Sequence, residues 1–124
     1  GLYDETSKRE MLAYIRPACI VLKPSLVGGF YGTEQWIRIA ESMGIAWWIT
    51  SALESNIGLN AIAQWTYIHG NPLPQGLGTG ALFTNNTDTP LYTEGGYLRY
   101  VAGKRPSRRG VEALFRERYG NGGL

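Results

Sequence analysis

The sequence of 124 residues is poor in the side chains that most often carry metal or nucleophilic chemistry. It contains a single cysteine, Cys19, and a single histidine, His69. One cysteine excludes an internal disulfide, and its place in an apolar segment predicts a reduced core residue, as is usual in the cytoplasm. One histidine, expected at a helix end, leaves no plausible Ser/His/Asp triad, and neither a CxxC nor an HExxH motif is present.

Long apolar runs and phosphate-binding loops are also missing. No run approaches the roughly 20 apolar residues that a membrane-spanning helix requires, and no basic-then-apolar leader stands at the N-terminus. Neither GxxxxGK[ST] nor a GxGxxG motif after a strand occurs, which argues against a nucleotide-binding loop. With 44% hydrophobic residues, the chain is expected to form one cytoplasmic domain, or part of one.

The charge is divided unevenly along the chain. Residues 1–95 carry five basic and eight acidic side chains, whereas residues 96–124 carry seven basic and only two acidic ones. The overall charge of +2 therefore hides a basic C-terminal tail. We predict a folded portion over residues 1–95 and a Gly-rich basic tail over residues 96–124, disordered or weakly helical around Val111–Tyr119.

An apolar run, Cys19–Leu22, leads into Lys23 and then into Pro24 and a glycine-rich loop. Such a run, bounded by Pro and Gly, is typical of a strand buried on both faces. A lysine at the end of the strand points to the edge where parallel sheets bind ligands. The position of Lys23 alone leaves several roles open: a snorkelling residue, a carboxylate anchor, a Schiff-base former or a general acid/base.

Helical and apolar segments alternate around this strand. Ser7 and Glu10 match a capping box for a first helix, which Pro17 ends, with Met11, Leu12 and Ile15 on one face. Thr33 is expected to cap a second helix that ends at Gly44. The apolar run Ile45–Ile49 then predicts a second buried strand that ends at Thr50.

A third helix and a third strand follow. The helix is expected near Gly58–Ile68, with Ser55 or Asn56 as its cap, and the strand over Ala81–Phe83. The three strand ends are about 30 residues apart, as in successive βα units. The sequence therefore predicts an α/β fold with about three parallel βα units. Because so few strands leave exposed edges, the chain is expected to be part of a barrel.

Three segments of the sequence resemble one enzyme family. VLKPSLVGG at Val21–Gly29, SALESNIGL at Ser51–Leu59 and QGLGTGALF at Gln75–Phe83 resemble, in order and spacing, the C-terminal part of o-succinylbenzoate synthase. This family belongs to the enolase superfamily, in the branch that resembles muconate-lactonizing enzymes. The resemblance runs from Gly1 to about Tyr92 and does not include the tail.

The resemblance implies a TIM-like (β/α)7β barrel, with the strand before Lys23 as its sixth strand, Ile45–Thr50 as its seventh and Gly80–Phe83 as its last. It also implies a lyase that eliminates water from a cyclohexadiene carboxylate in menaquinone (vitamin K2) biosynthesis. In this family a lysine on the second strand removes a proton, and Mg²⁺ holds the enediolate. Lys23 matches the second lysine, a cation that lies across the substrate ring.

The resemblance further implies contacts to the succinyl carboxylate of the substrate. These carry over to Ser51 and Ala52, and more weakly to Leu53 and Ser55. We also expect Gly78, which has no side chain, to leave room for the substrate. The base lysine and the carboxylate ligands of Mg²⁺ would precede Gly1, so no residue of this chain is expected to bind the metal. We therefore predict that the chain alone is inactive.

Other interpretations stay open at this stage. One is an N-acylamino-acid racemase of the same superfamily, in which the lysine that corresponds to Lys23 is a true base. Another is a non-catalytic half-barrel whose basic tail binds a polyanion, although a tail of this kind is more often simply solvated. The expected partners are a small carboxylate substrate and either the missing N-terminal part of the barrel or a second copy; a membrane is not expected, and nucleic acid is disfavoured.

Overall fold

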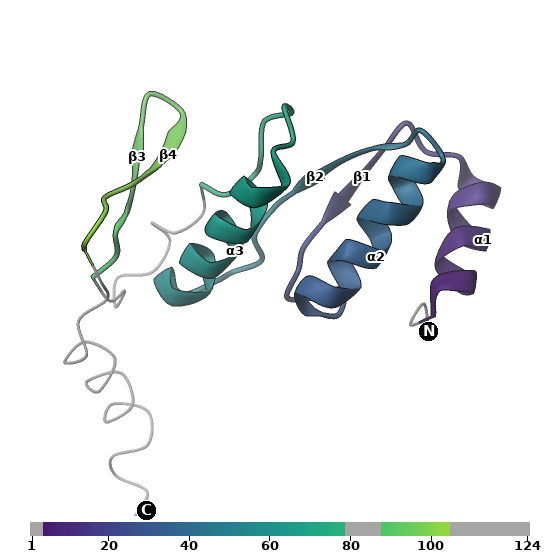
Figure 1. Cartoon of the computed structure of the whole chain (residues 1–124), viewed down its shortest axis with the longest axis horizontal. Coiled ribbons are helices and arrows are strands. Elements are labelled where there is room, and N and C mark those ends of the chain that lie inside the picture. The colour runs from purple at the N-terminus through teal and green to yellow at the C-terminus, as the bar shows by residue number, and fades with distance from the viewer. Residues whose placement is uncertain (1–3, 79–87, 105–124) are drawn as a thin grey trace, which may run out of the picture. The chain divides into compact units, whose positions relative to one another are not determined.

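The structure is a computed structural model that describes residues 4–78 and 88–104. It divides into two compact units, one made of residues 1–52 and 66–77 and the other of residues 53–65 and 78–124. Helix α3 contributes residues to both units. The elements are α1 (Glu5–Ile15), β1 (Cys19–Leu22), α2 (Gly29–Ser42), β2 (Ala46–Ile49), α3 (Asn56–His69), β3 (Leu91–Glu94) and β4 (Tyr97–Tyr100) (Figure 1).

The first unit contains a parallel pair of strands. β1 and β2 pair from Cys19 opposite Ala46 to Leu22 opposite Ile49, with α2 as the connection between them. The predicted α/β class with parallel strands is therefore confirmed. Gly76 adds a single parallel bridge to Thr50, just beyond the end of β2.

Only one face of this sheet is well covered. Leu22, Trp47 and Ile49 point to one side by the alternation of the strands and are buried, and α2 packs against β2. On the other face Val21 is 49% exposed and Ala46 is also exposed. The prediction of strands buried on both faces is thus wrong for the first unit, because none of its described elements covers the second face.

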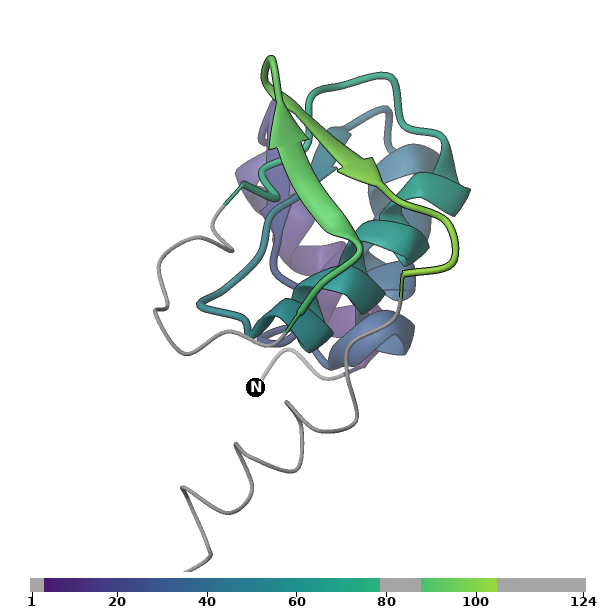
Figure 2. The ribbon, with the colours of Figure 1, turned by 90° about the vertical axis from the view of Figure 1, so that its left-hand side faces the viewer.

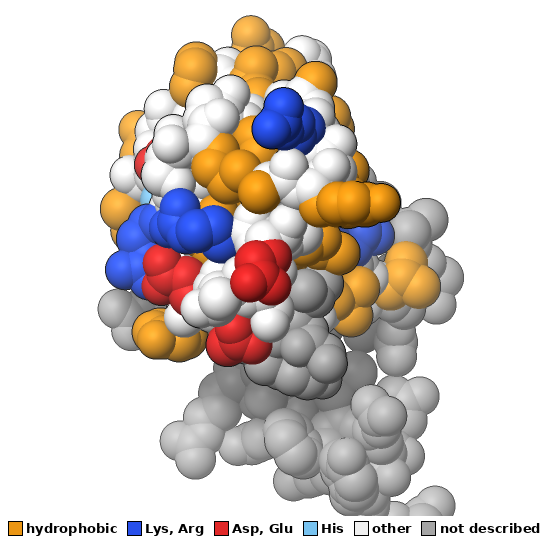
Figure 3. Space-filling view, turned by 90° about the vertical axis from the view of Figure 1, so that its right-hand side faces the viewer, with side chains coloured by type: hydrophobic (Ala, Val, Ile, Leu, Met, Phe, Trp, Pro, Cys, Tyr) orange, Lys and Arg blue, Asp and Glu red, His pale blue; other side chains and the backbone are white. Residues whose placement is uncertain are grey.

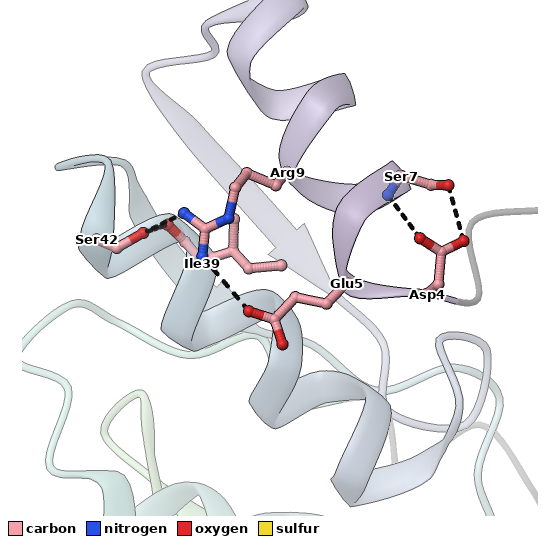
Figure 4. Close-up of polar contacts among 6 residues, drawn as sticks. All are labelled: Asp4, Glu5, Ser7, Arg9, Ile39 and Ser42. Atoms are coloured by element: carbon pink, nitrogen blue, oxygen red, sulfur yellow. Dashed lines mark hydrogen bonds and ion pairs between the residues drawn. The ribbon is translucent and has the colours of Figure 1, made fainter.

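Asp4, and not Ser7, caps α1. The backbone N–H of Ser7 donates to Asp4 Oδ1 and its hydroxyl to Oδ2, both at 2.8 Å (Figure 4). The predicted capping box at Ser7 and Glu10 is therefore wrong, since the helix has already begun at Glu5 and Ser7 lies within its first turn. The helix ends at Ile15, before Pro17 as predicted, and Arg16 follows it in the left-handed region, with φ of 50°.

The first helix buries less of its apolar face than its sequence predicts. Leu12 is buried, but Ile15 is 58% exposed. Lys8 is buried instead, at 3% exposure, with its ammonium 2.8 Å from Gln35 Oε1 and 5.5 Å from the centre of the Trp36 ring. The contacts of this lysine therefore join α1 to α2.

Helix α2 begins one turn earlier than its sequence predicts. Gly28 precedes it with φ of 95°, and the hydroxyl of Thr33 donates to the carbonyl of Gly29 at 2.6 Å. The predicted cap at Thr33 is wrong because this hydroxyl bonds backwards within the helix. Gly44 follows the helix with φ of 69°, which confirms the predicted end.

Polar contacts also tie the exposed sides of α1 and α2 together. Arg9 lies 3.4 Å from Glu5 and 3.2 Å from the hydroxyl of Ser42, which in turn donates to the carbonyl of Ile39 (Figure 4). Figure 3 shows basic and acidic side chains intermixed with apolar ones on one face of the molecule. That face therefore presents no broad patch of a single charge.

The second unit contains an antiparallel hairpin that the sequence analysis misses. β3 and β4 pair from Leu91 opposite Tyr100 to Glu94 opposite Tyr97 (Figure 2). Gly95 and Gly96 form the turn, with φ of 56° and 80°, as a two-residue hairpin turn requires. The hairpin spans the position at which the sequence analysis divides residues 1–95 from the tail.

The remaining sequence predictions fall partly outside the described residues. The third strand at Ala81–Phe83 and the short helix at Val111–Tyr119 both lie there. Helix α3 is confirmed, with bounds slightly wider than predicted. None of the described helices has the length and hydropathy needed to cross a membrane.

Candidate functional site

The carboxyl ends of β1 and β2 lie side by side at one edge of the parallel sheet. The backbone N–H of Thr50 donates to the carbonyl of Leu22 at 2.9 Å, which continues the ladder by one bond. Lys23 and Thr50 therefore follow the last paired residues as opposite neighbours. The alternation of the strands places both on the face that no described helix covers.

Lys23 is exposed and is held by a tight turn. Its carbonyl accepts from the backbone N–H of Leu26 at 2.8 Å, and the carbonyl of Pro24 accepts from Gly29 at 2.9 Å. Pro24 is fully buried, so the turn is anchored directly behind the lysine. The predicted glycine-rich loop thus fixes the backbone at Lys23 and leaves its side chain exposed.

Ser51 occupies the end of β2 and is only 3% exposed. Its backbone N–H donates to the carbonyl of Gly76 at 3.2 Å. A carboxylate that bound this N–H would have to displace Gly76, and the contact predicted at Ser51 stays a prediction. Ala52, the next residue of the prediction, is partly buried.

Gly76 approaches Thr50 so closely that a side chain would not fit. A Cβ added at Gly76 would lie 2.8 Å from Thr50 Oγ1 and 3.0 Å from Thr50 Cβ. The Thr50 hydroxyl donates to the carbonyl of Gly76 at 2.8 Å. This close contact brings a third chain segment to the edge that carries Lys23 and Ser51.

The other predicted site residues belong to the second unit. Leu53 is 73% exposed, and the hydroxyl of Ser55 accepts from the backbone N–H of Gly58 at 3.4 Å, as a cap of α3. A Cβ at Gly78 would meet no described atom within 4 Å, which agrees with open space at this glycine. The predicted cap at Ser55 is confirmed, whereas its contact with substrate stays a prediction.

No metal centre forms among the residues that the structure describes. They contain no group of three or more His, Cys, Asp and Glu side chains placed to hold an ion. Cys19 is only half-buried, on the same sheet face as Val21, so the predicted core position is wrong. Partial burial raises the pKa of its thiol, so the thiol stays protonated at neutral pH. His69 ends α3 as predicted, with its ring edge-on to Trp47 at 6.0 Å.

Two amide side chains near this edge escape the sequence analysis. Gln75 Oε1 accepts from the backbone N–H of Ile49 at 2.6 Å, and Asn71 Nδ2 donates to the carbonyl of Trp47 at 2.5 Å. The available signal is the pattern NPLPQ at residues 71–75, in which two amides flank a Leu between two prolines. Without strand pairing in view, this pattern indicates only a loop.

The chain shares its α/β fold with part of a solved structure. MenC from Desulfotalea psychrophila LSv54 superimposes with a TM-score of 0.73 and 55% identity, over 77% of this chain and 27% of that chain. No family model matches the sequence.

Curated relatives give the particular enzyme that the chain resembles. It is 59% identical over 88 residues to the o-succinylbenzoate synthase of Desulfotalea psychrophila, covering 71% of this chain and 24% of the relative. The o-succinylbenzoate synthase of Vibrio cholerae serotype O1, strain M66-2, is 40% identical over 72 residues, covering 57% of this chain and 21% of the relative. The chain thus spans about a quarter of the length of these relatives, and the predicted resemblance to o-succinylbenzoate synthase is confirmed.

Proposed function

We propose that the chain is the C-terminal part of an o-succinylbenzoate synthase with a (β/α)7β barrel. In the complete enzyme it contributes to the elimination of water from a cyclohexadiene carboxylate, a step towards menaquinone. The observation that carries the proposal is the 59% identity over 88 residues to a curated o-succinylbenzoate synthase. The parallel strands and the exposed Lys23 at their carboxyl edge support it.

Lys23 is proposed to act as a cation and not as the base. Its ammonium would lie across the substrate ring and stabilise the negative charge that develops when the proton leaves. An exposed lysine on an uncovered sheet face is suited to this role once further chain encloses it, because enclosure strengthens electrostatic interactions. Ser51 and Ala52 are proposed to contact the succinyl carboxylate, with weaker contributions from Leu53 and Ser55 and with room left at Gly78.

The described residues do not supply a ligand set for Mg²⁺, which prefers carboxylate oxygens. We propose that neither the metal nor the proton-abstracting base is held by residues of this chain. Both are proposed to come from the polypeptide that corresponds to the other three quarters of the relatives. The uncovered face at Val21 and Ala46 is the surface that this polypeptide would close.

Dehydratase activity tests the proposal. Three samples are compared with Mg²⁺ and the cyclohexadiene substrate: the chain alone, the remaining polypeptide alone, and the two mixed. We expect activity only in the mixture. Activity of the chain alone would contradict the assignment of the base and metal to the other part, and an inactive mixture in which the two parts bind each other would contradict the proposed function.

A further inference from the structure

The outer edge of β2 is completed by side chains where a sheet would normally provide another strand. This edge presents the Trp47 carbonyl, the Ile49 N–H and carbonyl, and the Ser51 N–H in succession. The side-chain amide of Asn71 donates to the Trp47 carbonyl at 2.5 Å, and Gln75 Oε1 accepts from the Ile49 N–H at 2.6 Å. The N–H of Gly76 donates to the Ile49 carbonyl at 2.8 Å, and the Gly76 carbonyl accepts from the Ser51 N–H at 3.2 Å. Four consecutive edge groups are thus satisfied by one short segment.

Each amide also holds the backbone of Leu73. Asn71 Oδ1 accepts from the Leu73 N–H at 2.9 Å, and Gln75 Nε2 donates to the Leu73 carbonyl at 2.6 Å. Each amide therefore places one group on β2 and the other on Leu73. The orientation of each amide follows from chemistry. A flipped Gln75 would set donor against donor at Ile49 and acceptor against acceptor at Leu73, and a flipped Asn71 would set acceptor against acceptor at Trp47 and donor against donor at Leu73. We call Asn71, Leu73 and Gln75 the amide clamp.

The sequence stiffens the clamp on both sides. Pro72 and Pro74 flank Leu73, and each fixes its own φ and restricts the residue before it. Less conformational freedom is then lost when the two amides reach the strand. The segment continues directly into Gly76, whose carbonyl accepts from both the Ser51 N–H and the Thr50 hydroxyl. The amide clamp is therefore joined through Gly76 to the residues that follow β2.

We propose that Gln75 is a positioning residue, which stands in for a strand at Ile49 and thereby sets the place of Ser51 at the carboxyl edge. Loss of the Gln75 bond to Ile49 removes one of the contacts that hold the segment before Gly76 on β2, so the Gly76 carbonyl that Ser51 bonds is held less firmly. The consequence for substrate binding rests on the proposed function, in which Ser51 contacts the succinyl carboxylate. The consequence for the backbone of β2 is independent of the proposed function.

Amide hydrogen exchange on the whole 124-residue chain tests the positioning itself. Gln75→Met keeps the length of the side chain but removes both hydrogen bonds. Gln75→Glu keeps the acceptor that faces Ile49. Gln64→Met is the matched control, since Gln64 is exposed and bonds only Asn60 within α3. We expect Gln75→Met to speed exchange at Ile49 and Ser51 by about fivefold or more. Gln75→Glu keeps the bond to Ile49 but loses the donor to the Leu73 carbonyl, so it should restore part of the protection at Ile49, and the control should change neither amide.

Two results would overturn the proposal. One is unchanged exchange at Ile49 and Ser51 in Gln75→Met. The other is a uniform rise at all amides of β1 and β2 that Gln75→Glu does not reverse, which would mean a general loss of stability. In an active mixture of the two polypeptides, Gln75→Met should raise KM for the substrate more than it lowers kcat. An inactive wild-type mixture would count against the proposed function, while the exchange pattern would still decide the role of Gln75.

Discussion

A single carboxylate controls the start of the first helix, and its titration gives a test at the scale of one residue. The pKa of Asp4 is lowered, chiefly because the backbone N–H of Ser7 donates to its carboxylate and also because the Ser7 hydroxyl does so. A lowered pKa means that the folded chain prefers the charged form. The resulting stabilisation is fully present above the pKa of the unfolded chain and is lost as pH falls below about 4.

The variant Asp4→Asn isolates this effect. Asparagine also caps a helix well but does not titrate, so the variant should lack this component of the pH dependence. We expect the wild-type chain to exceed Asp4→Asn in Tm at pH 6 and to lose that advantage by about pH 2.5. Thermal unfolding of both chains at a series of pH values measures the difference. A constant gap between them would show that the carboxylate charge contributes nothing to the cap.

Gly76 gives a second prediction at this scale. Gly76→Ala places a methyl group against Thr50, at 2.8 Å from its Oγ1, and so should lower the free energy of unfolding by about 1–3 kcal/mol. Gly78→Ala is the matched control, because its Cβ meets no described atom within 4 Å. Denaturant unfolding gives the free energy of unfolding of each variant. Equal stability of the two alanine variants would contradict the close contact at the end of β2.

At the scale of elements, two helical glycines should respond to alanine with opposite signs. A Cβ at Gly32 in α2 would lie 2.1 Å from the carbonyl oxygen of Val27, so Gly32→Ala should cost about 1–3 kcal/mol. A Cβ at Gly58 in α3 would meet mainly the flexible side chain of Glu54, at 3.3 Å. Gly58→Ala should therefore stabilise the chain by about 0.5–1 kcal/mol, through helix propensity.

Thermal unfolding of the two variants beside the wild-type chain decides this point. The account requires a lower Tm for Gly32→Ala and an equal or higher Tm for Gly58→Ala. If alanine at Gly32 were harmless, the carbonyl of Val27 would not lie against Gly32 as described.

The sequence predicts most of the helices and strands correctly, but it does not predict the residues at which the first two helices begin. Apolar periodicity predicts α2, α3, β1 and β2, and Gly44 correctly marks a helix end. Thr33 misleads because a threonine within a helix bonds backwards as readily as it caps. The hairpin at residues 91–100 is missed, although a Gly-Gly pair between two Tyr-containing segments is a hairpin signal.

At the scale of the whole chain, the site is predictable where it lies at the end of a strand. Lys23 and Ser51 lie at the same edge of the sheet because parallel pairing places the ends of β1 and β2 there. Gln75 and Asn71 are not predictable, since their role depends on the edge that β2 presents after folding. Lys8 is missed for a similar reason: its burial depends on Gln35 and Trp36, which lie on another helix.

The uncovered sheet face also belongs to this scale. Strand sequences without polar alternation indicate burial on both faces, yet Val21 and Ala46 are exposed in the described structure. The sequence thus predicts a covering that the described residues of the first unit do not supply. Relatives about four times as long as the matched segment are consistent with that covering, because the chain covers only 24% of the first of them.

The role of Lys23 is the central claim, and its substitution in the active mixture is the most direct test. Lys23→Ala removes the cation and should lower kcat by about 100-fold or more, whereas Lys23→Arg keeps a positive charge and should retain a measurable part of the activity. Lys104→Ala, at another exposed lysine, serves as the control and should not change kcat. Equal activity of Lys23→Ala and the wild-type mixture would contradict the account, and complete loss in both Lys23 variants would contradict a role as a cation alone.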